Sequence, residues 1–491
     1  MHRNQLDPKV SVSIVFVAAM FMSIMDTTIV NVALPSLARQ LNVPSTSIDA
    51  VVVAYLVSLA VVMPASGWLG DRWGTKRIFL IALTLFSVSS ALCGLASSYF
   101  MLIIFRVLQG AAGGALTPVG TAMLYRTFPP SQRVQVSRVL IIPTILAPAL
   151  GPVLGGLLVT QLSWRWVFYV NVPIGIAACL FGLIYLHEHR EATPGRFDLA
   201  GFLLAGIGLP LVMYALSEGP SSGWTSVNIL GSAIVGMFLL GAFVVIELRK
   251  REPMIDLHLL HDRLFRTTNL VSLFAYAGFL GVLFVSPLFL QEARGVSALM
   301  SGLTTFPEAI GVVLSTQVVA RLYPRIGPRR LMAGGLTGVA IMMAILSLIG
   351  QDTNLWVMRV LMFFIGAGMA YAFLPLRAAA FATISNTSTG RASAFYSSQT
   401  QLGAAIGVAV LGSVLSIIGP TTLSATGTIQ PNLAAYHAAF LAAAVLALIA
   451  ACIALTISDR DAAITMRRRG DASSTGEKEE PEQIPSVEAS S

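Results

Sequence analysis

The feature that most restricts the fold of this chain is an apolar stretch of about 20 residues, enough for a helix to cross a bilayer. It recurs fourteen times between the two ends of the chain. The stretches cover residues 11–34, 47–68, 78–97, 100–122, 137–159, 167–187, 198–216, 227–247, 267–290, 299–320, 331–350, 354–376, 393–418 and 435–457. Because 55% of the residues are hydrophobic and only 11% are charged, no soluble core accounts for them. The sequence therefore predicts an all-α polytopic membrane protein with fourteen transmembrane helices.

The positions of Lys and Arg predict how these helices are oriented. If the N-terminus is cytoplasmic, segments on that side hold 26 of the 31 basic residues, and the outside loops hold three. Cytoplasmic loops characteristically carry this excess. The net charge of +8 thus reflects topology and not nucleic-acid binding. We expect a multi-pass protein of the cell (inner or plasma) membrane with both termini in the cytoplasm.

Other classes of protein fit the sequence poorly. A cleaved signal peptide is an alternative for the first stretch, but that stretch is longer than usual and contains Asp26 and Asn31. The three cysteines lie in apolar stretches, which favours buried thiols over a disulfide framework or a metal site. No lysine follows a glycine, so a Walker A loop is excluded. We expect no enzyme activity and no cofactor, with an ion gradient or a separate ATPase subunit as the energy source.

The chain also contains an internal repeat. The segments "WLGDRWGTKR" (68–77) and "RLYPRIGPRR" (321–330) align at an offset of 253, and the same offset superposes "RVL" at 106–108 and at 359–361. The offset spans eight predicted helices, so the repeats run parallel in the membrane. The predicted organisation is an N-terminal six-helix bundle (1–190), two inserted helices with cytoplasmic linkers (191–266), a C-terminal six-helix bundle (267–457) and a disordered cytoplasmic tail (458–491). A short amphipathic helix is expected around "MIDLHLL" (254–260).

Five motifs follow one another in the first half of the chain. They are "MDTTIVNVALP" (25–35), "GWLGDRWGTKR" (67–77), "RVLQGAAGG" (106–114), "GPVLGG" (151–156) and "WRWVFYVNVPIG" (164–175). With them the chain resembles the major facilitator superfamily, and within it the fourteen-helix drug:proton antiporters of the EmrB/QacA type; Met25 and Thr75 depart from the family pattern. The resemblance implies two six-helix bundles that export hydrophobic, typically cationic compounds in exchange for protons by alternating access.

Asp26 is the first candidate site residue. A charged side chain in the middle of a membrane helix costs roughly 2.5–3.5 kcal/mol, so intramembrane carboxylates usually face a cavity and function there. The resemblance implies that Asp26 couples protons and attracts a cationic substrate. Asn31 is expected to line the polar part of the same cavity. The alternative is a neutral, hydrogen-bonded Asp26 that only fixes packing.

Arg106 and its neighbours form the second candidate. A permanently charged guanidinium within the membrane needs a partner, and the resemblance implies that Arg106 assists proton transfer. Snorkelling toward the membrane surface is the alternative. Gln109 is expected to line the cavity, while Gly110 and Gly113 share a helical face with Arg106 and would allow another backbone to approach closely.

Two glycine-rich segments are expected to bend or to gate. The small residues and prolines of the fifth predicted helix suit a bendable, close-packed hinge, which the resemblance identifies as the antiporter signature; ordinary tight packing is the alternative. In the cytoplasmic loop, the resemblance makes Asp71 half of a charged latch, whereas the turn glycine and basic residues are explained by topology alone. The hinge residues are Pro148, Gly151, Pro152, Gly155 and Gly156, and the loop residues are Gly67, Asp71, Arg72, Gly74, Lys76 and Arg77.

The second half of the chain offers fewer candidates. Glu308 is the other embedded carboxylate. One interpretation is that it recognises a cation or carries a second proton, and the alternative is a neutral, hydrogen-bonded structural role. Polar or aromatic cavity surface is expected from Gln399, Gln401, Tyr55, Tyr276, Phe274 and Phe279. The expected partners are a small hydrophobic or cationic substrate, protons and the lipid bilayer, and the chain is expected to be monomeric. Two other functions stay open: an uptake carrier for a polar metabolite, and a membrane receptor or assembly factor that transports nothing.

Overall fold

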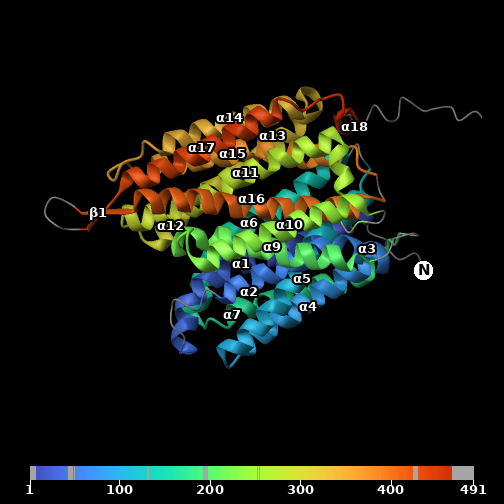
Figure 1. Cartoon of the computed structure of the whole chain (residues 1–491), viewed down its shortest axis with the longest axis horizontal. Coiled ribbons are helices and arrows are strands. Elements are labelled where there is room, and N and C mark those ends of the chain that lie inside the picture. The colour runs from blue at the N-terminus through green and yellow to red at the C-terminus, as the bar shows by residue number, and fades with distance from the viewer. Residues whose placement is uncertain are drawn as a thin grey trace, which may run out of the picture.

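The computed structural model consists of long helices that run side by side along one axis (Figure 1). It describes residues 7–42, 48, 50–129, 132–191, 197–250, 253, 255–385, 387–423 and 429–466. The predicted tail beyond residue 466, Met254 of the predicted amphipathic helix and the side chain of Asn31 lie outside the described residues.

The first half of the chain forms α1 to α8. Their bounds are α1 Pro8–Gln40, α2 Ala50–Val62, η1 Met63–Ala65, α3 Ser66–Trp73, α4 Thr75–Leu95, α5 Tyr99–Thr127, α6 Arg133–Gln161, α7 Trp166–Tyr169 and α8 Asn171–Tyr185. The inserted pair follows as α9 Leu199–Ser222 and α10 Val227–Arg249. The second half comprises η3 Leu257–His261, α11 Arg263–Leu288, η4 Phe289–Ala293, α12 Ala298–Thr305, α13 Pro307–Ile326, α14 Pro328–Leu346, α15 Leu355–Ala380, α16 Thr389–Ile418, β1 Thr421–Leu423, β2 Ile429–Pro431, α17 Leu433–Ala454 and α18 Ala463–Met466.

Among the described residues, thirteen helical segments are long and apolar enough to cross a membrane. They coincide with thirteen of the fourteen predicted stretches. The remaining stretch, 137–159, lies in the 29-residue helix α6, several of whose side chains are outside the described set. The multi-pass, all-helical prediction is therefore confirmed.

The two halves use the same packing plan. In the first half α5 packs against α2 and α4, and in the second half α15 packs against α13 and α14. Both α4 and α14 begin after a glycine with positive φ, Gly74 (99°) and Gly327 (85°). In each case a carboxylate that follows the last long helix of that half, α8 or α17, accepts from a backbone N–H of the first turn: Glu188 from Lys76 N (3.0 Å), and Asp459 from Arg329 N (3.0 Å). The equivalent caps are independent structural support for the repeat.

The inserted helices are not mere spacers. Helix α9 packs against α2 of the first half and α16 of the second, so it bridges the two halves, while α10 packs mainly on α9. Only 17% of the apolar window of α10 is buried, which leaves most of its surface available to lipid. This arrangement gives the pair a structural role that the sequence did not reveal.

Local details differ from the predicted helices. The stretch 299–320 is interrupted at Phe306, because Pro307 has no N–H to donate to the preceding turn. The stretch 167–187 is divided at Val170 into α7 and α8. The loop before α17 contains an antiparallel hairpin of β1 and β2, which the all-helical interpretation did not anticipate. The expected amphipathic helix near residue 257 is a 3₁₀ turn, η3.

We call the end of the molecule that carries α3 and α18 the basic end; it lies on the right in Figure 1, opposite β1. Here the halves touch directly. Ser393 Oγ of α16 donates to the carbonyl of Pro118 on α5 (2.9 Å), and Tyr125 on α5 stacks on Phe381 with ring centroids 4.2 Å apart. A Cβ on Gly67 of α3 would lie 2.7 Å from the carbonyl oxygen of Gly390. The basic end is therefore closed in this conformation.

Candidate functional site

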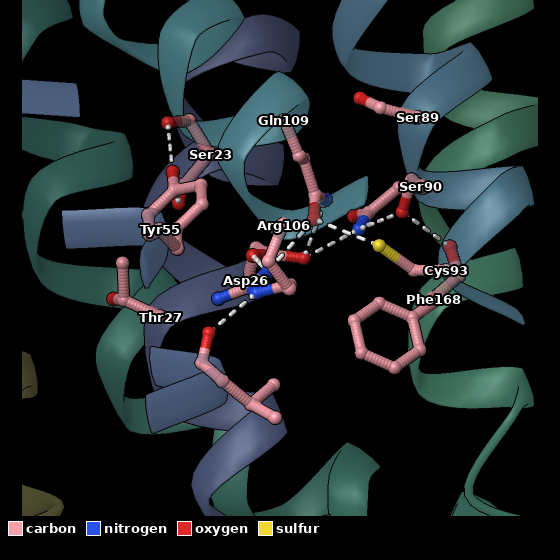
Figure 2. Close-up of polar contacts among 12 residues, drawn as sticks. Ser23, Asp26, Thr27, Tyr55, Ser89, Ser90, Cys93, Arg106, Gln109 and Phe168 are labelled. Carbon is pink, nitrogen blue, oxygen red and sulfur yellow. Dashed lines mark hydrogen bonds and ion pairs between the residues drawn. The ribbon is translucent and has the colours of Figure 1, made fainter. Parts of the chain in front are cut away.

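The most polar point inside the first half is the carboxylate of Asp26 on α1, which is 0% exposed (Figure 2). Its Oδ2 accepts from Arg106 Nη1 at 2.5 Å. Its Oδ1 accepts from Gln109 Nε2 at 2.9 Å and from Asn171 Nδ2 at 3.0 Å. Donors from α5 and α8 thus surround one carboxylate, and we call Asp26, Arg106, Gln109 and Asn171 the carboxylate cluster.

Arg106 is held on several sides. Its Nε donates to the carbonyl of Val51 on α2 (3.1 Å), and its Nη1 also donates to Gln109 Oε1 (2.8 Å). The guanidinium lies 4.3 Å from the ring centroid of Tyr55 and 5.8 Å from that of Phe168, positions in which the aromatic faces stabilise a cation. The side chain is 0% exposed, so the snorkelling interpretation is wrong and the expected partner is Asp26.

Asn171 extends the cluster to a fourth helix. Its Nδ2 also donates to Ser90 Oγ on α4 (3.1 Å), and Ser90 donates in turn to the carbonyl of Phe168 (2.9 Å). Neither Asn171 nor Ser90 was predicted as a site residue. The asparagine of "WRWVFYVNVPIG" was the available signal, since an amide inside an apolar stretch needs a polar partner just as Asp26 does.

The stability of this cluster depends on the charges of both Asp26 and Arg106. Each ion removed from water carries a penalty of several kcal/mol, which the mutual attraction and the surrounding hydrogen bonds must offset. Removal of one partner then leaves the other charge uncompensated, at a cost of about 3–5 kcal/mol. Arg106 Nη2 and Asn171 Oδ1 find no hydrogen-bond partner among the described residues, so the network is not fully satisfied. The carboxylate is enclosed here and does not face an open cavity.

Glycines bring the helices of the cluster together. A Cβ on Gly110 would collide with the carbonyl oxygen of Tyr55, which confirms the expected close approach of a second backbone, that of α2. A Cβ on Gly151 of α6 would collide with Thr28 Oγ1, two residues after Asp26. Gly155 is buried, whereas nothing lies within 4 Å of a Cβ on Gly156. The side chains of Pro148 and Pro152 lie outside the described set, so their part in a hinge stays a prediction.

The predicted gate loop lies at the basic end. Asp71 accepts from Arg126 Nη2 of α5 at 2.7 Å, and the same nitrogen lies 3.3 Å from Glu191 Oε1. A Cβ on Gly390 at the start of α16 would lie 2.8 Å from Asp71 Oδ1, so this carboxylate sits where the two halves meet. Gly74 adopts the expected positive φ. Lys76 donates to the carbonyls of Leu183 and Leu186, while Arg72 and Arg77 are exposed.

Glu308 stands apart from the carboxylate cluster. It lies in the first turn of α13, is 8% exposed, and its Oε1 has no hydrogen-bond partner among the described residues. Its backbone packs against Gly366 of α15. No interaction in the described part of the chain connects it to Asp26, so its role stays a prediction.

Most of the predicted cavity residues are engaged elsewhere. Tyr55 is fully buried with its ring against Arg106, so it offers no face to a substrate in this conformation. Tyr276 accepts from Arg377 (2.9 Å), and Gln399 donates to the carbonyl of Asn269 (2.7 Å). The remaining candidates are buried or half-buried, namely Phe274, Phe279 and Gln401.

Comparison with known proteins places this arrangement in a family. The Major Facilitator Superfamily model matches residues 16–408 and, in a second match, 268–479. The "Multidrug resistance protein B homolog" of Mycobacterium tuberculosis is 32% identical over 406 residues, which cover 82% of this chain and 75% of that protein. MdtD of Yersinia pestis is 32% identical over 421 residues, 86% of this chain and 89% of its own. The crystal structure of the human organic anion transporter MFSD10 superposes with a TM-score of 0.66, covering 91% of this chain and all of that one; its 16% identity shows the fold alone.

The chain is a polytopic membrane transporter by fold and family. It belongs to the major facilitator superfamily, as its motifs predicted. Membership confirms the predicted fold and the expectation that the chain is not an enzyme, and it places a lipid bilayer and small-molecule substrates among the partners.

Proposed function

We propose that this protein exports hydrophobic, cationic drugs or toxic compounds from the cell in exchange for protons, by alternating access of its two halves. The similarity to a protein named for multidrug resistance, over 82% of this chain, supports export of drugs. Proton exchange and the cationic substrate rest on the residues of the chain itself. The proton gradient is the proposed energy source.

The observation that carries proton coupling is the enclosed ion pair of Asp26 and Arg106. A proton on Asp26 would abolish the charge that compensates the guanidinium and would convert one acceptor oxygen into a donor. The hydrogen bonds between α1, α5 and α8 would then no longer fit. Binding of one proton therefore changes the relative stability of helix arrangements within the first half, which is what a coupled transporter requires.

The contacts at the basic end support alternating access. Access from this side requires separation of α3 from α16 and of α5 from α16, because these helices touch there through Gly67, Gly390, Pro118 and Ser393. Asp71, held by Arg126, lies at the same junction and is the proposed latch. In a second conformation the basic end opens, and water reaches the carboxylate cluster during the exchange between the two.

The proposed orientation follows from the basic residues. The loops rich in Lys and Arg are proposed to face the cytoplasm, together with both termini, in a cell membrane. The opposite end, with the hairpin of β1 and β2, then faces outward. The chain is proposed to work as a monomer, since the two halves that alternate contact each other within one chain, as Ser393 does with Pro118.

The test uses everted membrane vesicles with a preformed pH gradient and a fluorescent cationic dye. The wild-type protein should dissipate the gradient when the dye is added, and Asp26→Asn should abolish this effect at equal amounts of inserted protein. Asp352→Asn is the matched control, because Asp352 is exposed in the loop before α15 and should leave the exchange intact. Full coupling in Asp26→Asn would refute the assignment. Dye movement that ignores the pH gradient in the wild type would refute proton exchange altogether.

A further inference from the structure

Arg377 lies in the last turn of a candidate membrane-spanning helix, and its environment differs from that of Arg106. It lies on α15, in the candidate span Leu355–Ala380. Its Nη2 donates to the hydroxyl of Tyr276 on α11 (2.9 Å), and its Nε is buried without a hydrogen-bond partner. No carboxylate in the described part of the chain forms an ion pair with it. The positive charge is therefore held only by neutral groups.

Two arginines of α5 have their charge compensated by carboxylates. Arg106 is paired with Asp26, and Arg126 is paired with Asp71 and Glu191. A neutral hydroxyl compensates a guanidinium less well than a carboxylate does, because it carries no charge and cannot accept two parallel hydrogen bonds. Arg377 thus keeps an unused capacity for an anion. Ionisable residues inside a membrane span with this property are candidates for substrate recognition.

Two groups of aromatic rings are linked to Arg377, one through Tyr276, which accepts from its guanidinium, and one through Tyr125, which donates to its carbonyl. The ring of Tyr276 packs on Phe373 with centroids 4.6 Å apart. Phe381 contacts Tyr125 and Tyr396 at 4.2 and 5.8 Å. Tyr125 comes from the first half of the chain and the other four rings from the second. We call Arg377 and these five rings the arginine–aromatic cluster.

The first half of the chain covers this cluster in the closed conformation. Tyr125 donates its hydroxyl proton to the carbonyl of Arg377 (3.0 Å) and stacks on Phe381. Both contacts cross between the halves at the basic end, beside the contact of Ser393 with Pro118. When the halves separate there, Tyr125 moves away with α5, and Arg377 becomes accessible from the basic end.

We propose that the arginine–aromatic cluster is a binding site for aromatic compounds that carry a carboxylate. The guanidinium can form two parallel hydrogen bonds with a carboxylate. The rings are buried in the closed conformation and become available to stack on the body of the compound when the halves separate. The inference rests on the proposed function, because the site opens only when the two halves alternate. It extends the substrates from cationic compounds to those with a cationic aromatic body and an acidic substituent.

A matched pair of dyes tests the proposal. Rhodamine 110 carries a free carboxylate, and rhodamine 123 is its methyl ester. Initial transport rates of both are measured in vesicles with wild-type protein, Arg377→Gln, Arg377→Lys and the control Arg330→Gln, whose side chain is exposed at the basic end. Arg377→Gln should lower the rate ratio of acid to ester by about tenfold or more, as expected for loss of a charged hydrogen bond. The rate ratio of Arg377→Lys should lie between those of the wild type and Arg377→Gln, and the ratio of Arg330→Gln should stay within about twofold of the wild-type ratio.

Other outcomes overturn the proposal in distinguishable ways. An unchanged ratio in Arg377→Gln, or an equal loss of both dyes, would make Arg377 a structural element of the closed basic end. If the wild type moves neither dye, the proposed function is in question, and fluorescence anisotropy with purified full-length protein decides the site by itself. Preferential loss of rhodamine 110 binding in Arg377→Gln then supports it, and equal binding to wild type and variant refutes it. Tyr276→Phe, which removes the internal acceptor, should retain rhodamine 110 binding and guards against a folding defect in Arg377→Gln.

Discussion

The buried ion pair of Asp26 and Arg106 leads to a quantitative prediction about stability. In Asp26→Asn the amide oxygen can still accept from Gln109 and Asn171, but its NH₂ group then faces the guanidinium, so two donors meet and the charge is uncompensated. The cost is about 3–5 kcal/mol of unfolding free energy. Arg106→Met, which retains much of the side-chain volume, leaves the carboxylate unpaired and should cost a similar amount.

The double variant Asp26→Asn/Arg106→Met should lose much less than the sum of the two. Without the guanidinium, the amide of residue 26 can donate to Gln109 Oε1, which no longer receives Arg106. We expect a coupling free energy of roughly 3 kcal/mol, measured by denaturant titration of the purified protein in detergent for all four members of the cycle. If the two losses add to within about 0.5 kcal/mol, the residues do not stabilise each other and the reasoning fails.

Two further predictions use glycines at helix contacts. Gly110→Val should lower the yield of folded protein sharply, because its side chain would collide with the carbonyl of Tyr55. The control Gly156→Ala meets open space and should express like the wild type. Size-exclusion chromatography compares the two variants, and equal profiles would contradict the packing of Gly110 against Tyr55. Gly67→Ala should hinder closure at the basic end, because its methyl group would contact Gly390. Faster labelling of a cysteine placed in this contact, relative to the same cysteine without the alanine, is the expected result, and unchanged labelling would exclude a closing role.

The sequence was sufficient to predict the helices, because crossing a bilayer imposes a minimum apolar length that is visible without any tertiary information. It was also sufficient to locate one half of the site. Asp26, Arg106 and Gln109 were singled out since polar groups in apolar helices are costly wherever they point. Their mutual pairing was not predictable: Asp26 and Arg106 are separated by 80 positions, and helix periodicity does not determine which faces of α1 and α5 meet.

The interruptions within predicted helices and the contribution of Asn171 to the site were harder to predict, because both depend on local structure and packing. Pro307 ends one helical segment, whereas Pro118 and Pro375 lie inside continuous helices, so a proline in the apolar pattern does not by itself predict an interruption. Asn171 is the first residue of α8, directly after the break at Val170, and donates to Asp26. A motif can mark such a residue, but its partner depends on packing among α1, α4 and α8.

The repeat finally shows why similar sequences in the two halves need not perform the same task. At the offset of 253, Arg359 is the counterpart of Arg106 and Phe279 that of Asp26. Without the carboxylate, Arg359 donates to Met300 Sδ (3.1 Å) and lies over the ring of Trp356, 4.6 Å from its centroid. A proton arriving at this second position would find no carboxylate to neutralise, and the buried carboxylate of the second half, Glu308, lies on another helix, α13. In the second half, Arg377 donates to Tyr276 and has no ion-pair partner among the described residues, which is why we propose it as the site for the charge of a substrate. Proton and anionic substituent would therefore act on different halves, and coupling between them must pass through the contacts at which the halves meet.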